Sequence, residues 1–284
     1  MNTDFTEVPL RHAMDITYDS FLKSAGELAE LDWRKFRRRS ARRHLEERLQ
    51  ELGLPDYGQY LEHLRVDTEE VLRLPDLMRV TVSRFFRERA CWLELSEKVL
   101  PALLESREAD EPIRAWSVGC CNGEEPYSLA ILFLSNLYSS AKLRNRKVEI
   151  LATDIDDKVL ARARDGCYQK SSLREAPGEV VEHFFSLDRR GRCLHEDVKA
   201  LIRFKKHNFM EDQLPLGMDL VLCRYLAFTY YRGERRRQAA LRLWEAVKPG
   251  GALMTGRKES LGPGEAGLFE PWPETEVIYR KKTS

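Results

Sequence analysis

The first 75 residues carry apolar side chains at helical spacing. From Trp33 to Leu52 the apolar positions recur every three to five residues, and Gly53 then ends the run. That spacing predicts one amphipathic helix with a glycine at its C-terminal stop. We therefore expect a small helical N-terminal domain over 1–75, followed by a linker and connecting helix over 76–110. The other predicted helices cover 16–29 and 57–64, and a last one is capped by Asp67 with Glu70 and ended by Pro75.

From about residue 110 the pattern changes to short apolar runs that alternate with amphipathic stretches. This alternation is typical of a doubly wound, mostly parallel α/β sheet that binds ligands at the carboxyl ends of its strands. We assign this ligand-binding domain to 111–284. The stretch 167–205 departs from the alternation and contains "FFSLDRRGRCLH", so we expect a small inserted β subdomain there. The predicted strands are 113–118, 147–155, 218–225, 252–257 and 276–282, and the predicted helices are 126–141, 156–166 and 235–251.

Composition narrows the class of protein further. Hydrophobic residues make up 43% of the 284 positions, enough for a core, and charged residues make up 33%. No apolar run is long enough to span a membrane, and the N-terminus lacks the pattern of a signal peptide. We therefore expect a cytoplasmic protein. The six cysteines form no CxxC pair and no metal-ligand spacing, which predicts reduced thiols and no metal.

Charge is balanced overall but concentrated in one place. The net charge is +1, which makes nucleic acid an unlikely partner of the chain as a whole. The segment Arg34–Arg43, "RKFRRRSARR", has seven basic residues in ten. It is either a solvated helix face or a docking surface for an acidic partner or RNA.

The stretch "WSVGCCNGEEPYS" forms a glycine turn between the first strand and its helix. Such turns usually bind phosphate at the helix N-terminus, but Glu124 and Glu125 would repel it. The turn also lacks the GxGxxG pattern of a nicotinamide dehydrogenase. Asp154 ends the second strand, where it can accept hydrogen bonds from ribose hydroxyls, while Asp156 fits the role of helix cap better. A nucleoside with a cationic far end, S-adenosylmethionine, satisfies both observations.

Four segments in this order resemble the CheR-type chemotaxis receptor methyltransferases. They are "TVSRFFRE", "WSVGCCNGEEPYSLA", "ILATDID" with "LARARDGCY", and "LVLCR". These enzymes transfer a methyl group from S-adenosylmethionine to receptor glutamates and release S-adenosylhomocysteine. The resemblance implies a divergent member, a protein-glutamate O-methyltransferase in chemotaxis-type signalling. It also favours the docking interpretation of Arg34–Arg43, because the family carries a basic face at that place for an acidic protein acceptor or signalling partner.

The resemblance also implies a set of site residues. Arg87 matches the arginine near the transferable methyl group and the acceptor carboxylate, so it is predicted to be catalytic as well as close to the cofactor. The other cofactor-binding positions carried over are Ser83 in the linker, Gly119, Cys120, Glu124 and Glu125 for the methionine part, Asp154 and Ile155 for the ribose, Asn208 and Phe209 for the adenine, and Cys223 and Arg224 for the inner edge.

The departures from the family pattern lie on the acceptor side. Thr81 and Ser83 replace the Asn and Thr of the linker, Tyr225 takes an Asn position, and Thr229 takes the position of a tyrosine. Tyr230 could supply that phenol, which makes it the second predicted catalytic residue; the alternative is an ordinary aromatic at a strand end. Two other functions stay open: a methyltransferase with a non-receptor or small-molecule acceptor, and a non-catalytic protein that binds S-adenosylmethionine or S-adenosylhomocysteine.

Overall fold

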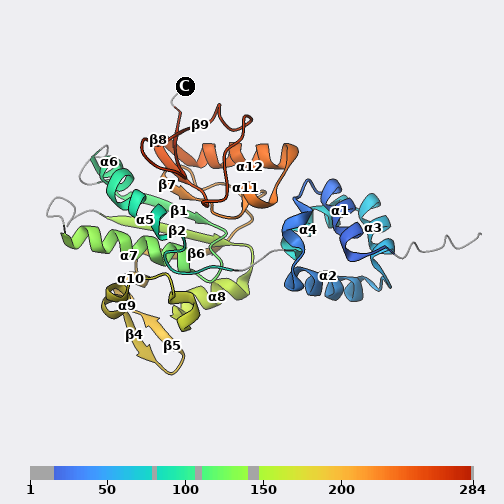
Figure 1. Cartoon of the computed structure of the whole chain (residues 1–284), viewed down its shortest axis with the longest axis horizontal. Coiled ribbons are helices and arrows are strands. Elements are labelled where there is room, and N and C mark those ends of the chain that lie inside the picture. The colour runs from blue at the N-terminus through green and yellow to red at the C-terminus, as the bar shows by residue number, and fades with distance from the viewer. Residues whose placement is uncertain (1–15, 79–81, 106–110, 140–146, 283–284) are drawn as a thin grey trace, which may run out of the picture. The chain divides into compact units, whose positions relative to one another are not determined.

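The computed structural model describes residues 16–78, 82–105, 111–139 and 147–282. The chain divides into two compact units, Met1–Val80 and Thr81–Ser284. Within the described residues, no helix combines the length and the apolar character needed to cross a membrane. Figure 1 labels the elements of both units.

The N-terminal unit is helical, as the spacing of apolar residues predicts. The prediction of one helix from Trp33 to Leu52 is wrong, however. Arg38 has an extended backbone (φ −125°, ψ 142°) that separates a short 3-10 helix from α2, while Arg34 and Arg37 both lie over the Trp33 ring. The elements are α1 (Tyr18–Leu28), η1 (Trp33–Phe36), α2 (Arg39–Leu52), α3 (Tyr57–Val66) and α4 (Thr68–Leu77).

The last helix of this unit also runs further than expected. Asp67 caps α4 as predicted, accepting a hydrogen bond from the Glu70 N–H at 3.0 Å. Pro75 does not end the helix, which continues to Leu77. Pro75 lacks only the N–H that would donate to the Val71 carbonyl, and the Met78 N–H still donates to the Leu74 carbonyl at 3.0 Å, so the last turn forms.

The second unit is built on a seven-stranded sheet, which confirms the predicted doubly wound α/β fold. The strand order is β6-β2-β1-β7-β8-β10-β9, and β10 runs antiparallel to its neighbours while β6, β2, β1, β7 and β8 are parallel. The strands are β1 (Ile113–Val118), β2 (Val148–Asp154), β6 (Ile202–Lys206), β7 (Met218–Leu222), β8 (Val247–Met254), β9 (Phe269–Pro271) and β10 (Ile278–Lys281).

Helices cover both faces of this sheet (Figure 1). Helices α7 and α8 contact β2 and β6, whereas α12 contacts β7 and β8. The chain winds outward from β1 to β6 and then returns to β7 on the other side of β1. The carboxyl ends of β1 and β7 therefore form a switch point, the usual ligand site of such sheets. The helices are α5 (Arg89–Glu94), a π-helical turn η2 (Leu95–Val99), α6 (Leu100–Glu105), α7 (Glu124–Ser139), α8 (Asp157–Asp165), α11 (Ala227–Tyr230) and α12 (Gly233–Ala246).

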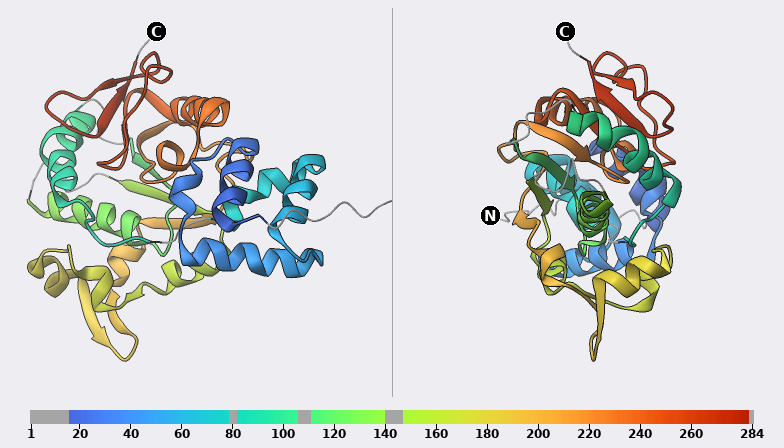
Figure 2. Two further views of the ribbon diagram at one scale, coloured as in Figure 1. Left: turned by 45° about the vertical axis from the view of Figure 1, so that its right-hand side comes forward. Right: turned by 90° about the vertical axis from the view of Figure 1, so that its left-hand side faces the viewer.

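A small antiparallel sheet of order β3-β5-β4 interrupts the main fold, as the polar glycine turn predicts. Its hairpin of β4 and β5 projects from the second unit in all three views (Figures 1 and 2). The next strand, β6, already belongs to the large sheet. The subdomain contains β3 (Cys167–Tyr168), η3 (Lys170–Leu173), α9 (Gly178–Phe184), β4 (Phe185–Asp188), β5 (Gly191–Leu194) and α10 (Glu196–Lys199).

The subdomain also corrects the prediction that all thiols are reduced. Cys167 and Cys193 form a disulfide. They are directly opposite each other in the β3–β5 pair, with Cα atoms 4.0 Å apart. Strand register brings the two sulfurs together across 26 residues of sequence, which the spacing of cysteines alone could not reveal. The other four cysteines are free thiols.

Candidate active site

In the turn after β1, the backbone conformation and the close neighbours leave no room for a side chain at the two glycines. Gly119 has φ +68°, and a Cβ there would lie 3.0 Å from the Leu226 side chain. At Gly123, φ is +90° and a Cβ would lie 2.9 Å from that of Ala163. Cys121 shares the left-handed conformation at φ +52°. Both positions therefore favour glycine, and a glycine turn at the switch point lets backbone N–H groups approach a ligand.

Asp154 lies at the end of β2 beside this turn. Its two carboxylate oxygens accept hydrogen bonds from the N–H groups of Cys121 and Asp156, each at 3.0 Å. Asp156 caps α8 by accepting from the Lys158 N–H at 2.8 Å, so the cap and the predicted ribose ligand are separate residues. The exposed fraction of Asp154 is 8%, and Ile155 follows it, half-buried.

The two glutamates of the turn have different surroundings. Glu124 is buried, and the Ser172 hydroxyl donates to one of its oxygens at 3.3 Å. The other oxygen, Oε2, is buried without a hydrogen-bond partner among the described residues. Burial raises the pKa of Glu124, although hydrogen bonds from Ser172 and Ser83 oppose the shift. Glu124 thus presents a buried carboxyl oxygen that lacks a donor.

Glu125, by contrast, is already engaged. It accepts from the Ser117 hydroxyl at 2.8 Å and lies 3.6 Å from Nη1 of Arg224. Burial raises its pKa, while the charges of Arg224 and Arg87 and the Ser117 hydrogen bond lower it. Glu125 therefore links the glycine turn to Arg224.

Arg87 lies between two residues in the left-handed region, Phe86 at φ +51° and Glu88 at φ +64°. Its guanidinium stacks on the Tyr225 ring, with Cζ 3.9 Å from the ring centroid. Its Nη1 donates to the Val82 carbonyl at 3.3 Å. No carboxylate within the described residues forms an ion pair with Arg87. Thr81, the other changed linker position, lies outside the described residues.

Arg224 is the buried cation of the site. Its Nη2 donates to the Arg87 carbonyl at 2.8 Å and to the Glu88 carboxylate at 2.9 Å. Burial alone would raise the pKa of Glu88, but hydrogen bonds from Tyr225 and from the Arg257 N–H, together with Arg224, hold it below its usual value. Glu88 was not predicted as a site residue; its only sequence signal is that it follows Arg87.

The tyrosine that contacts Arg87 is Tyr225. Tyr225 has φ +57°, and its hydroxyl donates to Glu88. The buried carboxylate of Glu259 accepts from the Tyr225 N–H at 2.7 Å and from the Thr229 hydroxyl at 2.6 Å. Thr229 thus fixes the loop. Tyr230, half-buried, is the last residue of α11.

The loop after β6 adjoins Asp154 from the other side. The His207 N–H donates to the Asp154 carbonyl at 3.0 Å, which places Asn208 and Phe209 directly beyond it. Asn208 accepts from the Met210 N–H, and the Phe209 ring lies 6.2 Å from that of Trp116. On the inner side, Cys120 and Cys223 are buried at the ends of β1 and β7, and burial raises the pKa of both thiols.

The fold, the switch point and the acidic glycine turn define an α/β domain of the class that binds S-adenosylmethionine. A family model described as "CheR methyltransferase, SAM binding domain" matches residues 81–278. The chain therefore belongs to the CheR methyltransferase family, as its motifs predict.

Individual relatives agree with this family. A chemotaxis protein methyltransferase of Listeria innocua is 32% identical over 213 residues, 75% of this chain and 78% of that protein. One of Borreliella burgdorferi is 28% identical over 272 residues, 92% of this chain and 91% of that protein. An uncharacterized 104.1 kDa protein of Rhodobacter capsulatus is 31% identical over 240 residues, 84% of this chain but 25% of that protein. This chain thus spans a quarter of the last relative and most of the other two.

Proposed function

We propose that this protein methylates a carboxylate with S-adenosylmethionine, and that the acceptor is a protein glutamate, as in chemotaxis-type signalling. The observation that carries the proposal is an arrangement of opposite charges at one switch point. Buried carboxyl groups line the glycine turn, and Arg87, which pairs with none of the described carboxylates, lies on the acceptor side. The carboxyl groups suit a cationic methyl donor, and Arg87 suits an anionic acceptor.

The residues of the turn fit the amino-acid end of S-adenosylmethionine. The unpartnered Oε2 of Glu124 would accept from the ammonium group, which would also stabilise the buried charge. Glu125 is occupied by Ser117 and Arg224, so we assign the ammonium contact to Glu124. The Nε of Arg224 is a buried donor without a partner among the described residues, and it matches the carboxylate of the same end.

The ribose would lie on Asp154. Two backbone N–H groups anchor its carboxylate beside the glycine turn, and carboxylate oxygens can accept several hydrogen bonds, including those of hydroxyl donors. Asn208 and Phe209 directly follow His207, whose N–H donates to the Asp154 carbonyl. This position next to the proposed ribose site supports their assignment to the adenine. Ser83, Gly119, Cys120, Ile155 and Cys223 complete the proposed cofactor set.

The cofactor, when bound, supplies an electrophilic methyl group and leaves as S-adenosylhomocysteine. Arg87 would hold the acceptor carboxylate in a bidentate fork and align one oxygen for in-line displacement. A carboxylate is already ionised at neutral pH, so no general base is required. Catalysis then depends on proximity, alignment and exclusion of water. We retain Tyr230 as a proposed second contact to the acceptor.

Methyl transfer to a purified chemoreceptor cytoplasmic fragment tests the proposal. We expect the wild-type protein to label receptor glutamates and to form S-adenosylhomocysteine. Asp154→Ala should abolish cofactor binding measured by calorimetry, whereas Arg87→Ala should preserve binding and remove turnover. Asp157→Ala and Arg89→Ala, which change exposed neighbours, serve as matched controls. Equal loss of cofactor binding in the Asp154 and Arg87 variants would contradict the division of roles.

The acceptor side leaves one alternative that a specific observation favours. The Tyr225 ring lies where the family carries an asparagine, so the acceptor could differ from a receptor glutamate. Labelling of another carboxylate, with receptor fragments unlabelled, would support a non-receptor or small-molecule acceptor. Cofactor binding without S-adenosylhomocysteine from any acceptor would indicate a non-catalytic signalling protein.

A further inference from the structure

We propose that Tyr225 is a positioning residue for Arg87 and that its ring sets the plane in which the acceptor carboxylate is bound. The starting point is the stack of the Arg87 guanidinium on the Tyr225 ring at 3.9 Å. A stacked guanidinium has one face covered, while its N–H groups point outward in its own plane. A carboxylate must then approach edge-on, in the geometry that permits two parallel hydrogen bonds.

Three contacts hold Tyr225 in place, through its backbone N–H, its hydroxyl and its ring. The Tyr225 N–H donates to Glu259 at 2.7 Å, and its hydroxyl donates to Glu88. On one side the ring lies against Gly256, where an added Cβ would be 2.7 Å from the nearest ring carbon. These contacts keep Tyr225 at φ +57°, a left-handed conformation that is unfavourable for a non-glycine residue. Such a conformation persists only where the surroundings determine it.

The same contacts keep the nearest acid away from Arg87. Glu88 adjoins Arg87 in sequence, but its carboxylate is bound by Arg224, by the Tyr225 hydroxyl and by the Arg257 N–H. Among the described residues, the Arg87 guanidinium therefore forms no ion pair; it contacts the neutral Tyr225 ring and donates to the Val82 carbonyl. Tyr225 thus does two things: it engages the competing carboxylate and supports the guanidinium. Its role toward an acceptor rests on the proposed function, but the stack itself does not.

The test separates the ring from the hydroxyl. Tyr225→Phe keeps the ring and removes the bond to Glu88, while Tyr225→Leu removes the ring. With the receptor fragment as probe, we expect Tyr225→Leu to raise the KM for the acceptor about three- to thirtyfold, the range of a cation–π contact. Tyr225→Phe should stay within about threefold, and the cofactor Kd should stay within about twofold in both.

A second readout requires no activity. The ring current of Tyr225 should shift the side-chain NMR signals of Arg87 upfield in the wild-type protein and in Tyr225→Phe, and the shift should vanish in Tyr225→Leu. Trp244→Leu, which removes the ring beside Lys281 at 4.0 Å, is the matched control and should change neither KM nor the Arg87 signals.

The outcomes distinguish this inference from the proposed function. A wild-type protein that labels no acceptor but shows the Arg87 shift would overturn the function and keep the stack. Equal rises in KM for the Phe and Leu variants would overturn the positioning role, and so would an unchanged KM in Tyr225→Leu. Should Tyr225→Leu fail to fold, Gly256→Ala displaces the ring instead, and a smaller rise in KM with a smaller Arg87 shift is expected.

Discussion

At the scale of single residues, the site combines buried acids with backbone conformations that few residues adopt. Four of the six non-glycine residues with positive φ among the described residues lie at the site: Phe86, Glu88, Cys121 and Tyr225. Such conformations cluster at ligand-binding sites because surrounding contacts must hold them. The acidic character of the glycine turn could be predicted from the sequence, since charge is a property of residue type. It could not predict these φ angles, which depend on contacts such as Glu259 with the Tyr225 N–H.

Glu124→Gln should stabilise the free protein and weaken cofactor binding. The raised pKa of Glu124 means that the folded protein favours the protonated carboxyl, because ionisation is opposed by burial. Its contribution to stability is complete below the unfolded-state pKa and is lost as pH rises through the folded-state pKa. Glutamine does not ionise, so the variant should melt a few degrees above the wild type at neutral pH.

The comparison across pH provides the control for this prediction. At acidic pH, where Glu124 is protonated in both states, the melting temperatures of the two proteins should converge. Calorimetry should show weaker binding of S-adenosylmethionine by the variant at neutral pH. A variant less stable than the wild type at neutral pH would show that the carboxylate has a stabilising partner in the free protein.

At the scale of elements, the hydrophobic pattern predicts the observed helices and strands where a single helical or strand period dominates the sequence. The alternation of strands and helices predicted β1, β2 and β7, which bury nearly continuous apolar runs. It did not predict β6, which is only partly buried and falls mostly within the stretch assigned to the inserted subdomain. The errors occurred where tertiary contacts compete with local pattern. The extended backbone of Arg38 interrupts a helical repeat, and Pro75 does not end α4. The partner of Cys193 depends on strand register, which the sequence does not display.

Reduction of the Cys167–Cys193 disulfide should destabilise the small β subdomain. A bridge that spans 26 residues lowers the conformational entropy of the unfolded chain and so stabilises the folded state by about 3–4 kcal/mol. Hydrogen exchange in β4 and β5 should therefore speed up when a phosphine reductant is added. The Cys167→Ser variant should show the faster exchange without the reductant and no further response to it. Unchanged exchange in the reduced wild-type protein would show that strand pairing alone holds the subdomain.

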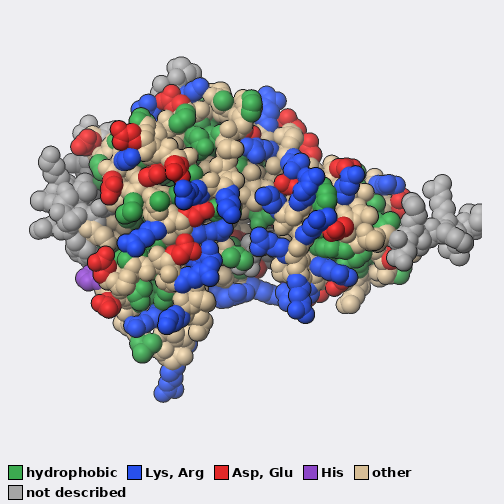
Figure 3. Space-filling model, in the orientation of Figure 1, with side chains coloured by type: hydrophobic (Ala, Val, Ile, Leu, Met, Phe, Trp, Pro, Cys, Tyr) green, Lys and Arg blue, Asp and Glu red, His purple; other side chains and the backbone are tan. Residues whose placement is uncertain are grey.

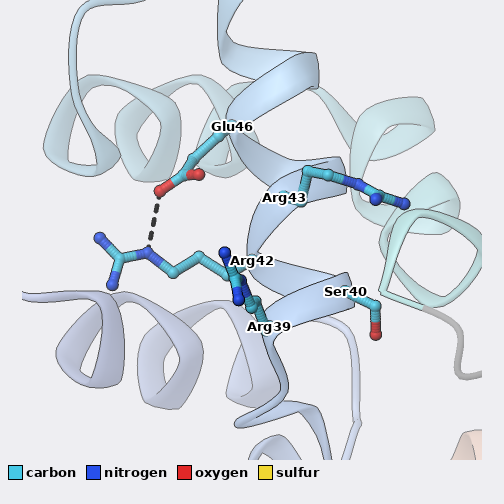
Figure 4. A pocket seen from close by; sticks show the side chains of 5 residues that line it. All are labelled: Arg39, Ser40, Arg42, Arg43 and Glu46. Atoms are coloured by element: carbon cyan, nitrogen blue, oxygen red, sulfur yellow. Dashed lines mark hydrogen bonds and ion pairs between the residues drawn. The ribbon is translucent and has the colours of Figure 1, made fainter.

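At the scale of the whole molecule, one unit of the chain carries the basic segment Arg34–Arg43 and the other carries the candidate site. The three arginines Arg39, Arg42 and Arg43 begin α2 and line a hollow of about 640 Å³ together with Ser40 and Glu46 (Figure 4). Arg42 extends to Glu46 at 2.8 Å, and Arg43 points away from it. Basic side chains lie over the part of this unit where Figure 1 places α2 (Figure 3).

Reversing two of these charges should weaken acceptor docking and leave the chemistry intact. We expect Arg39→Glu with Arg43→Glu to raise the KM for the receptor fragment about tenfold at low salt, with little change in kcat, because steering by exposed charges acts on encounter. The difference from wild type should shrink as salt increases. Arg65→Glu, on α3, is the matched control. A change confined to kcat would remove α2 from acceptor recognition.

The buried acids of the glycine turn have a consequence for the proton balance of ligand binding. Burial raises the pKa of both Glu124 and Glu125 in the free protein, and a bound cation would lower both. At a pH where these carboxyl groups are partly protonated in the free protein, binding of S-adenosylmethionine must then release protons to the buffer. Calorimetric enthalpies measured in buffers of different ionisation enthalpy should differ at acidic pH and coincide at alkaline pH. Buffer-independent enthalpies throughout would mean that the acids are already ionised before the ligand arrives.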